Sequence, residues 1–319
     1  TTVLTETDRF GRRLGPEAIT EFLAATAELP VRVFATLPAD PFLDGVPGKA
    51  AAVGERDALL ALAGHPRVAG VGELFWNQVA GRETALAPLL ETVRAVGGVV
   101  WGHGAGCHDR KLSAFASVVD NDHELLTAGD VAPRVARGIT PIGRCGSIRD
   151  DSALLGATDE QLLRSEGCLC SDGMWPTELL AEGYMDHVVR QTIAAGVSPE
   201  VAFRMATLNA ARHCRLDGLG TLTPGAHADV IVLSDVERVS VETVISDGAV
   251  VVEGGTPQVT ARPHEYPPAW YETAAVAVEP ERFRVDADKA TEGSVRAIGY
   301  VGGLLSESRT VRPAREGDE

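Results

Sequence analysis

The chain has 319 residues, of which 45 % are apolar, enough to bury a core in one large domain or in a large and a small one. Its formal net charge of −16 and isoelectric point near 4.9 argue against nucleic acid or an anionic membrane surface as partner. No apolar run approaches the roughly 18 residues that cross a bilayer, and no secretory signal is visible at the N-terminus. Five cysteines without a CxxC pair favour a cytoplasmic location over a disulfide framework.

Short β-branched segments alternate with helical segments over the first half of the chain, and this alternation indicates parallel βαβ units. We expect helices over 15–29, 56–64, 85–96, 109–117, 130–138 and 158–166. We expect strands at 2–6, 31–37, 68–74, 98–103, 118–123, 140–146 and 167–172. The fold class is therefore α/β, a TIM-like (β/α)8 barrel whose first strand is missing from this chain. A closed barrel needs eight strands, and folded proteins avoid the open sheet edges that seven would leave.

The pattern changes after the last barrel strand. Helices are expected over 177–183, 186–195 and 199–211, and antiparallel strands over 219–233 and 241–254. Residues 259–288 look irregular, 294–305 resemble the start of a further β unit, and 314–319 look like a solvated tail.

Four residues suited to metal binding fall at the carboxyl ends of expected strands: Glu73, His103, His123 and Asp172. In a barrel these ends form one mouth, where active sites are assembled. Two imidazoles and two carboxylates suit a divalent Zn, Mn or Fe ion, which lowers the pKa of bound water. Asp172 is placed to accept a proton and return it to a leaving amine. The alternative is four unrelated polar residues with structural roles.

Two cysteines share a strand face with Asp172. Cys168 and Cys170 precede it at a period of two, so we expect their side chains to point into the barrel interior. We interpret them as small buried apolar residues rather than as thiolate ligands.

Several motifs resemble the amidohydrolase superfamily. MATLNAARHCRLDGLGTLTPGAHADVIVL (205–233) and VETVISDGAVV (241–251) resemble the segment that joins the barrel to a small β-sandwich domain in these enzymes. The adenine deaminase family is suggested by GVGELFWN (70–77), WGHGAG (101–106), NDHE (121–124), RCGS (144–147) and EGYMDHVVRQTI (182–193). The resemblance implies a barrel domain over 1–215 with strands two to eight, a β-sandwich portion over 216–258, and a linker with the start of a C-terminal domain over 259–319.

The resemblance also implies roles for individual residues. Glu73 would bridge two divalent metal ions, Mn or Fe with Zn as a further candidate, and would count as catalytic together with Asp172. His103 and His123 would bind one metal, while Asp172 would bind the other and serve as the proton shuttle. Substrate-binding positions would be Glu6, Arg144, Ser147 and Trp175. The family's His-x-His of the first barrel strand has no match, so we expect a portion of a longer enzyme or a partner chain that supplies this strand.

The implied function is metal-dependent hydrolytic deamination of adenine or a related purine-like heterocycle by metal-bound hydroxide, in a homo-oligomer. Some pocket motifs differ from the family's: Glu6-Thr7-Asp8-Arg9 replaces Asp-Pro-His-Glu, and Cys145 replaces the Glu of Arg-Glu-Gly-Ser. Two alternatives therefore stay open. One is hydrolysis of another cyclic amide or amidine, and the other is a catalytically silent subunit of a split amidohydrolase.

Overall fold

The computed structural model describes residues 1–43, 53–79, 83–260, 262–272, 279, 293–302 and 305–312. It divides into two compact units, Thr1–His264 and Glu265–Glu319. Each unit is described by itself.

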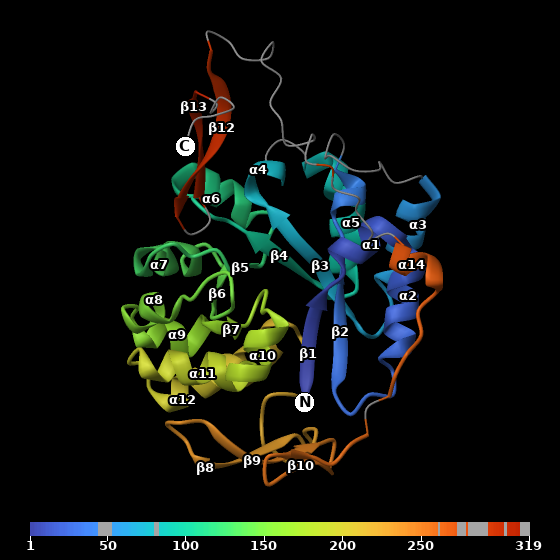
Figure 1. The fold of residues 1–319 in the computed structure, drawn as a ribbon, viewed down its shortest axis with the longest axis vertical. Helices are drawn as coiled ribbons and strands as arrows, with labels where there is room; N and C mark the ends of the chain where they lie inside the picture. The colour runs from blue at the N-terminus through green and yellow to red at the C-terminus, as the bar shows by residue number, and fades with distance from the viewer. Residues whose placement is uncertain are drawn as a thin grey trace. The chain divides into compact units, whose positions relative to one another are not determined.

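The first unit is built on parallel strands that follow one another around a curled sheet (Figure 1). One run pairs in the order β1 (Thr2–Glu6), β2 (Arg32–Leu37), β3 (Val68–Phe75) and β4 (Val99–His103). The next run pairs in the order β5 (Asn121–Asp122), β6 (Thr140–Arg144) and β7 (Cys168–Cys170). The Asp120 amide donates to the Val100 carbonyl at 2.9 Å and joins the two runs. All seven strands expected from the sequence are present, and they confirm a partial parallel barrel of the α/β class.

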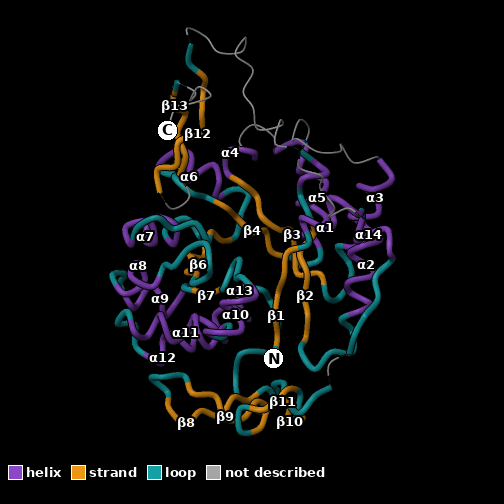
Figure 2. Tube along the Cα trace, viewed as in Figure 1, coloured by secondary structure: helices purple, strands orange, loops and turns teal. Residues whose placement is uncertain are grey.

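Helices lie on the outside of these strands, as the purple segments of Figure 2 show. They are α1 (Asp8–Leu14), α2 (Pro16–Ala25), α3 (Val53–Leu62), α4 (Trp76–Val79), α5 (Glu83–Ala95), α6 (Asp109–Ala116), α7 (Val131–Val135), α8 (Ser152–Gly156) and α9 (Glu160–Glu166). Helix α1 was not expected, because Gly11 at its centre is a poor helix former. Gly11 lets α1 approach α2 closely, because a Cβ atom there would lie 2.9 Å from Ile19 Cδ1 and would require that side chain to shift.

An apolar layer fills the inside of the curl. Alternation along β4 points Val99 and Trp101 into this layer, while Val100 faces the helices. Cys168 is buried in the same layer, with Cys170 packed against it, which confirms the expected orientation of both thiols. Burial raises the pKa of the Cys168 thiol, which keeps it protonated. The next inward position on β4 is His103. The imidazole therefore lies on the same face as Val99 and Trp101, at the carboxyl end of the strand.

Helices α10 (Pro176–Glu182), α11 (Met185–Ala194) and α12 (Pro199–Arg204) follow the last parallel strand. Helix α12 continues through a π-helical turn (Met205–Asn209) into α13 (Ala210–His213). An antiparallel sheet comes next, with β8 (Val230–Asp235), β9 (Ser240–Ser246), β10 (Ala249–Glu253) and β11 (Thr256–Pro257). The expected strand over 219–233 is thus correct only from residue 230 onward. Arg32 at the start of β2 ties this sheet to the barrel, with Nη1 2.6 Å from Asp229 and Nη2 2.8 Å from Asp247.

The second unit contains helix α14 (Pro268–Glu272) and an antiparallel hairpin of β12 (Val295–Gly302) and β13 (Leu305–Val311). The irregular structure expected over 259–288 was wrong at α14, where Pro268 occupies the first helical position that proline tolerates. The β unit expected from 294 is confirmed by the hairpin, while the expected tail at 314–319 lies outside the described residues. Among the described residues, no helix has the length and apolar character required to cross a membrane.

Candidate active site

The residues selected from the sequence lie at or just beyond the carboxyl ends of the parallel strands. Glu6, His103 and Arg144 are the last residues of β1, β4 and β6, and Glu73 is near the end of β3. His123 directly follows β5, and Asp172 is two residues beyond β7. The structure therefore brings these side chains to one end of the curled sheet, as the strand assignments predicted.

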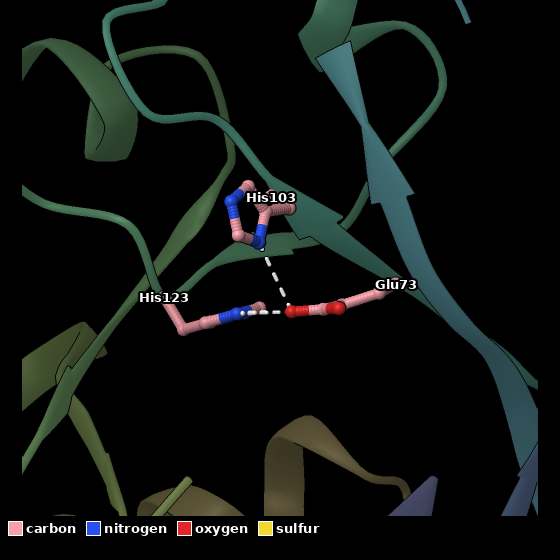
Figure 3. A group of neighbouring side chains, drawn as sticks. All are labelled: Glu73, His103 and His123. Carbon is pink, nitrogen blue, oxygen red and sulfur yellow. Dashed lines mark hydrogen bonds and ion pairs between the residues drawn. The ribbon is translucent and has the colours of Figure 1, made fainter. Parts of the chain in front are cut away.

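Glu73, His103 and His123 converge on one another (Figure 3). His103 Nδ1 donates to Glu73 Oε1 at 3.0 Å, and His123 Nε2 donates to the same oxygen at 2.8 Å. The two imidazole rings are nearly perpendicular, at 86°, with centroids 5.3 Å apart. One carboxylate oxygen and two ring nitrogens from three different strands thus point at a common position.

A buried ion pair holds the two histidine-bearing segments together. Arg134 of α7 donates through Nε to Asp122 Oδ2 at 2.7 Å and through Nη2 to the Gly104 carbonyl at 3.1 Å. Asp122 Oδ1 accepts from the amides of Gly104 and Glu124, both at 2.9 Å. Gly104 follows His103, and Asp122 precedes His123, so this network fixes both imidazoles relative to each other.

The electrostatics of the site follow from burial and from this pairing. Burial alone would raise the pKa of Glu73, but hydrogen bonds from His103 and His123 outweigh it and lower that pKa. Burial also opposes protonation of His123, yet the hydrogen bond and charge of Glu73 raise its pKa to about 9. Burial and the Glu73 charge raise the pKa of Glu6 to about 7, and burial together with Glu6 raises the pKa of Asp8 well above its usual value. The site therefore gathers more carboxylates than its own cations neutralise.

Asp172 belongs to a second group of charged side chains, next to the triad formed by Glu73, His103 and His123. Ligand atoms of His123, Glu124 and Asp172 lie within 4.8 Å of one another. The Arg144 guanidinium pairs with the Asp172 carboxylate and lies 2.8 Å from Glu124 Oε1. Asp172 has a left-handed backbone with φ of 52°, an uncommon and strained conformation for a residue other than glycine. His123 therefore belongs to both groups of candidate ligands, one with Glu73 and the other with Asp172.

The remaining substrate-binding candidates lie at the rim of the site. Ser147 Oγ accepts a hydrogen bond from the Trp175 amide at 2.6 Å, and the Trp175 residue is 59 % exposed. Glu6 Oε1 accepts from the Glu73 amide at 3.1 Å, so it lies directly beside the triad. Their roles toward a substrate stay predictions.

Sequence reasoning missed the residues that support the triad. Asp122, Glu124 and Arg134 are buried but were not singled out, although Asp122 and Glu124 flank His123 in the motif NDHE. The available signal was the run of acids at the end of an apolar strand, because a charge buried there must be paired.

The donor set fits a divalent transition metal. Imidazole nitrogens and carboxylate oxygens are the ligands that Zn, Mn and Fe take in proteins, and here they come together with separations of 3.0 Å and 2.8 Å. Glu73, His103 and His123 would hold the ion, with Asp172 as a further carboxylate.

Comparison with known proteins agrees with this geometry. The amidohydrolase family profile matches residues 138–251. The chain belongs to the amidohydrolase superfamily. Among its relatives is adenine deaminase 3 of Rhizobium meliloti (strain 1021), 32 % identical over 282 residues, which are 86 % of this chain and 47 % of the relative. Adenine deaminase of Rubrobacter xylanophilus is 36 % identical over 262 residues, which are 79 % of this chain and 43 % of the relative. This amidohydrolase chain spans about half the length of the curated relatives it matches.

Solved structures show the same fold. The β-aspartyl dipeptidase of Fervidobacterium islandicum AW-1 superposes with a TM-score of 0.60 at 18 % identity, over 82 % of this chain and 75 % of that one. The N-acetyl-D-glucosamine-6-phosphate deacetylase of Mycobacterium smegmatis gives 0.55 at 19 % identity, over 79 % and 74 % of the two chains. Both support the assignment of the barrel and say nothing of substrate.

Proposed function

We propose that the protein is a metal-dependent amidohydrolase that acts on a C–N bond of adenine or a related purine-like heterocycle and releases ammonia. The observation that carries the proposal is the convergence of Glu73, His103 and His123 at the carboxyl end of the strands. The adenine deaminases among the relatives support adenine as the first substrate to test.

The roles of the side chains follow from their positions. Glu73, His103 and His123 would hold the cation. A bound divalent cation would lower the pKa of water and supply hydroxide near neutral pH. Asp172 accepts a proton on its carboxylate and donates it to the leaving amine. The exposed Trp175 indole at the rim offers a flat apolar surface on which a heterocycle can stack.

The test is release of ammonia from adenine by the full-length protein supplied with Mn²⁺, Fe²⁺ or Zn²⁺. We expect Asp172→Asn to lower kcat by about 10²–10⁴-fold with the fold unchanged, because general acid–base catalysis contributes about that much. Glu178→Gln, on α10 beyond the site, is the matched control that removes one carboxylate and keeps activity.

Two results would contradict the proposal in different ways. Release of ammonia from another cyclic amidine but not from adenine would reject adenine and keep the reaction class. Protein that carries no divalent metal after reconstitution and releases no ammonia would reject the amidohydrolase activity itself.

A further inference from the structure

A fully buried carboxylate beside the triad has no hydrogen-bond partner. Glu124 directly follows His123, and its side chain is 0 % exposed. Within the described part of the chain, neither Oε1 nor Oε2 of Glu124 takes part in a hydrogen bond. Arg144 Nη1 lies 2.8 Å from Oε1 and offsets the charge, but buried carboxylate oxygens usually accept hydrogen bonds as well, so their absence calls for a specific explanation.

Glu124 faces the same two nitrogens as Glu73. Its Oε1 lies 3.6 Å from His103 Nδ1 and 3.6 Å from His123 Nε2. Glu73 Oε1 approaches these nitrogens at 3.0 Å and 2.8 Å. Two imidazole nitrogens and two carboxylate oxygens therefore form a ring of donor atoms around a common position.

The spacing of this ring fits one coordination shell. Ligand atoms bound at about 2.1 Å to a tetrahedral cation are about 3.4 Å from one another. The four adjacent separations in the ring are 2.8, 3.0, 3.6 and 3.6 Å, which bracket that value. These four separations are compatible with ligands that share one first-row transition metal.

Two arginines also lie close to the carboxylate of Glu124. Arg144 Nη1 lies 2.8 Å from Oε1, and Arg149 Nη1 lies 3.6 Å from Oε2. Both guanidinium groups are largely buried, with side chains 4 % and 11 % exposed. Their charges favour the ionised form of Glu124 and oppose burial, which raises the pKa of this carboxyl.

We propose that Glu124 is an additional ligand of the metal centre, binding through its carboxylate the same divalent transition-metal ion as His103 and His123. Glu73 then lies on one side of the two imidazoles and Glu124 on the other. The inference rests on the proposed function for the existence of the centre, and it adds a ligand beyond the residues matched to the family motifs. The competing role is that of a charge partner for Arg144 and Arg149 alone.

Cobalt provides the test, because its visible spectrum reports the ligands directly. Full-length wild-type protein, Glu124→Gln and Glu124→Cys would be titrated with Co²⁺ against a chelator. We expect Glu124→Gln to weaken Co²⁺ binding more than about 100-fold, beyond the loss typical of residues that only support ligands, and to change the d–d bands. Glu124→Cys should show a thiolate-to-cobalt charge-transfer band that the wild-type protein lacks.

Arg149→Gln is the matched control, because it removes a charged neighbour of Glu124 without removing a donor atom. It should keep the wild-type d–d bands and weaken Co²⁺ binding less than the Glu124→Gln variant. Wild-type bands and affinity in Glu124→Gln would overturn the inference, as would a cobalt-loaded Glu124→Cys protein without the charge-transfer band. Should the Cys variant not fold, the Gln variant decides. Wild-type protein that binds no Co²⁺ would instead overturn the centre itself, a failure of the proposed function.

Discussion

The carboxylates of Asp122 and Glu124 lie in different surroundings, although the two residues flank His123 in the chain. Both side chains are 0 % exposed. Asp122 accepts hydrogen bonds from two backbone amides and from Arg134, at 2.7–2.9 Å. Glu124 accepts none from the described residues, although two arginines and two imidazoles lie within 3.6 Å. The chain thus places a hydrogen-bonded carboxylate and one held only by ion pairs two residues apart.

The difference suggests that Asp122 stabilises the fold, whereas Glu124 is available for ligand binding. Both oxygens of Asp122 accept hydrogen bonds, and this pairing holds the segments that carry His103 and His123. Glu124 accepts no hydrogen bond from the described residues, so its oxygens retain the capacity to bind a cation. Local strain or incomplete pairing of this kind is what functional sites show.

The largest effect on stability should come from removing the charge of Asp122, the hydrogen-bonded carboxylate. Asp122→Asn removes the nearest charge partner of the buried Arg134 and leaves it with Asp130, 3.6 Å away. We therefore expect the free energy of unfolding to fall by about 3–5 kcal/mol. Urea denaturation of the full-length protein measures it. Glu124→Gln should lower the same quantity by less, because Arg144 keeps its ion pair with Asp172 and no hydrogen bond to Glu124 is lost. Equal losses in the two variants would contradict the division of roles.

A smaller effect should follow from crowding the paired carboxylate without removing it. A Cβ atom at Gly104 would lie 2.2 Å from Asp122 Oδ2, so Gly104→Ala must displace the ion pair. We expect a loss of about 1–3 kcal/mol, the usual cost of overpacking, measured by thermal or urea unfolding. Gly129→Ala is the control, because its nearest atom would be 3.5 Å away. A Gly104→Ala protein as stable as the control would show that the network tolerates displacement.

The smallest effect concerns pH and the residue before Asp122. Asn121 Nδ2 donates to His213 Nε2 at 2.7 Å, which requires a neutral imidazole, and burial lowers the pKa of His213 to about 4. The unfolded chain has the ordinary value near 6.5, so stability is unaffected above that pH. As the pH falls from 6.5 toward 4, the unfolded state takes up a proton that the folded state does not, and stability decreases.

His213→Gln should flatten this acid-side dependence, because glutamine does not titrate in that range. The measurement is the urea midpoint of both proteins at pH 7.5 and pH 5. An unchanged slope in the variant would assign the pH dependence to another group.

Much of this arrangement was predictable from the sequence, because parallel strands have a fixed direction and alternation. Asp172 follows Cys168 and Cys170 at a period of two, so it was expected on the interior face. His103 was expected at the carboxyl end of its strand. The role of Glu124 was not predictable. Strand β5 has only two residues, and the chain bends directly after Asp122, so alternation no longer says where Glu124 points. Its partners Arg144 and Arg149 come from the next strand and the loop beyond it, and only the folded chain brings them together.

The most direct measurement is anomalous diffraction at the absorption edge of Mn or Zn from crystals of the full-length protein. The account predicts a strong anomalous peak bonded to His103 Nδ1, His123 Nε2 and Glu73 Oε1. No peak at that position, with both imidazoles still hydrogen-bonded to Glu73 in crystals grown with excess metal, would contradict it.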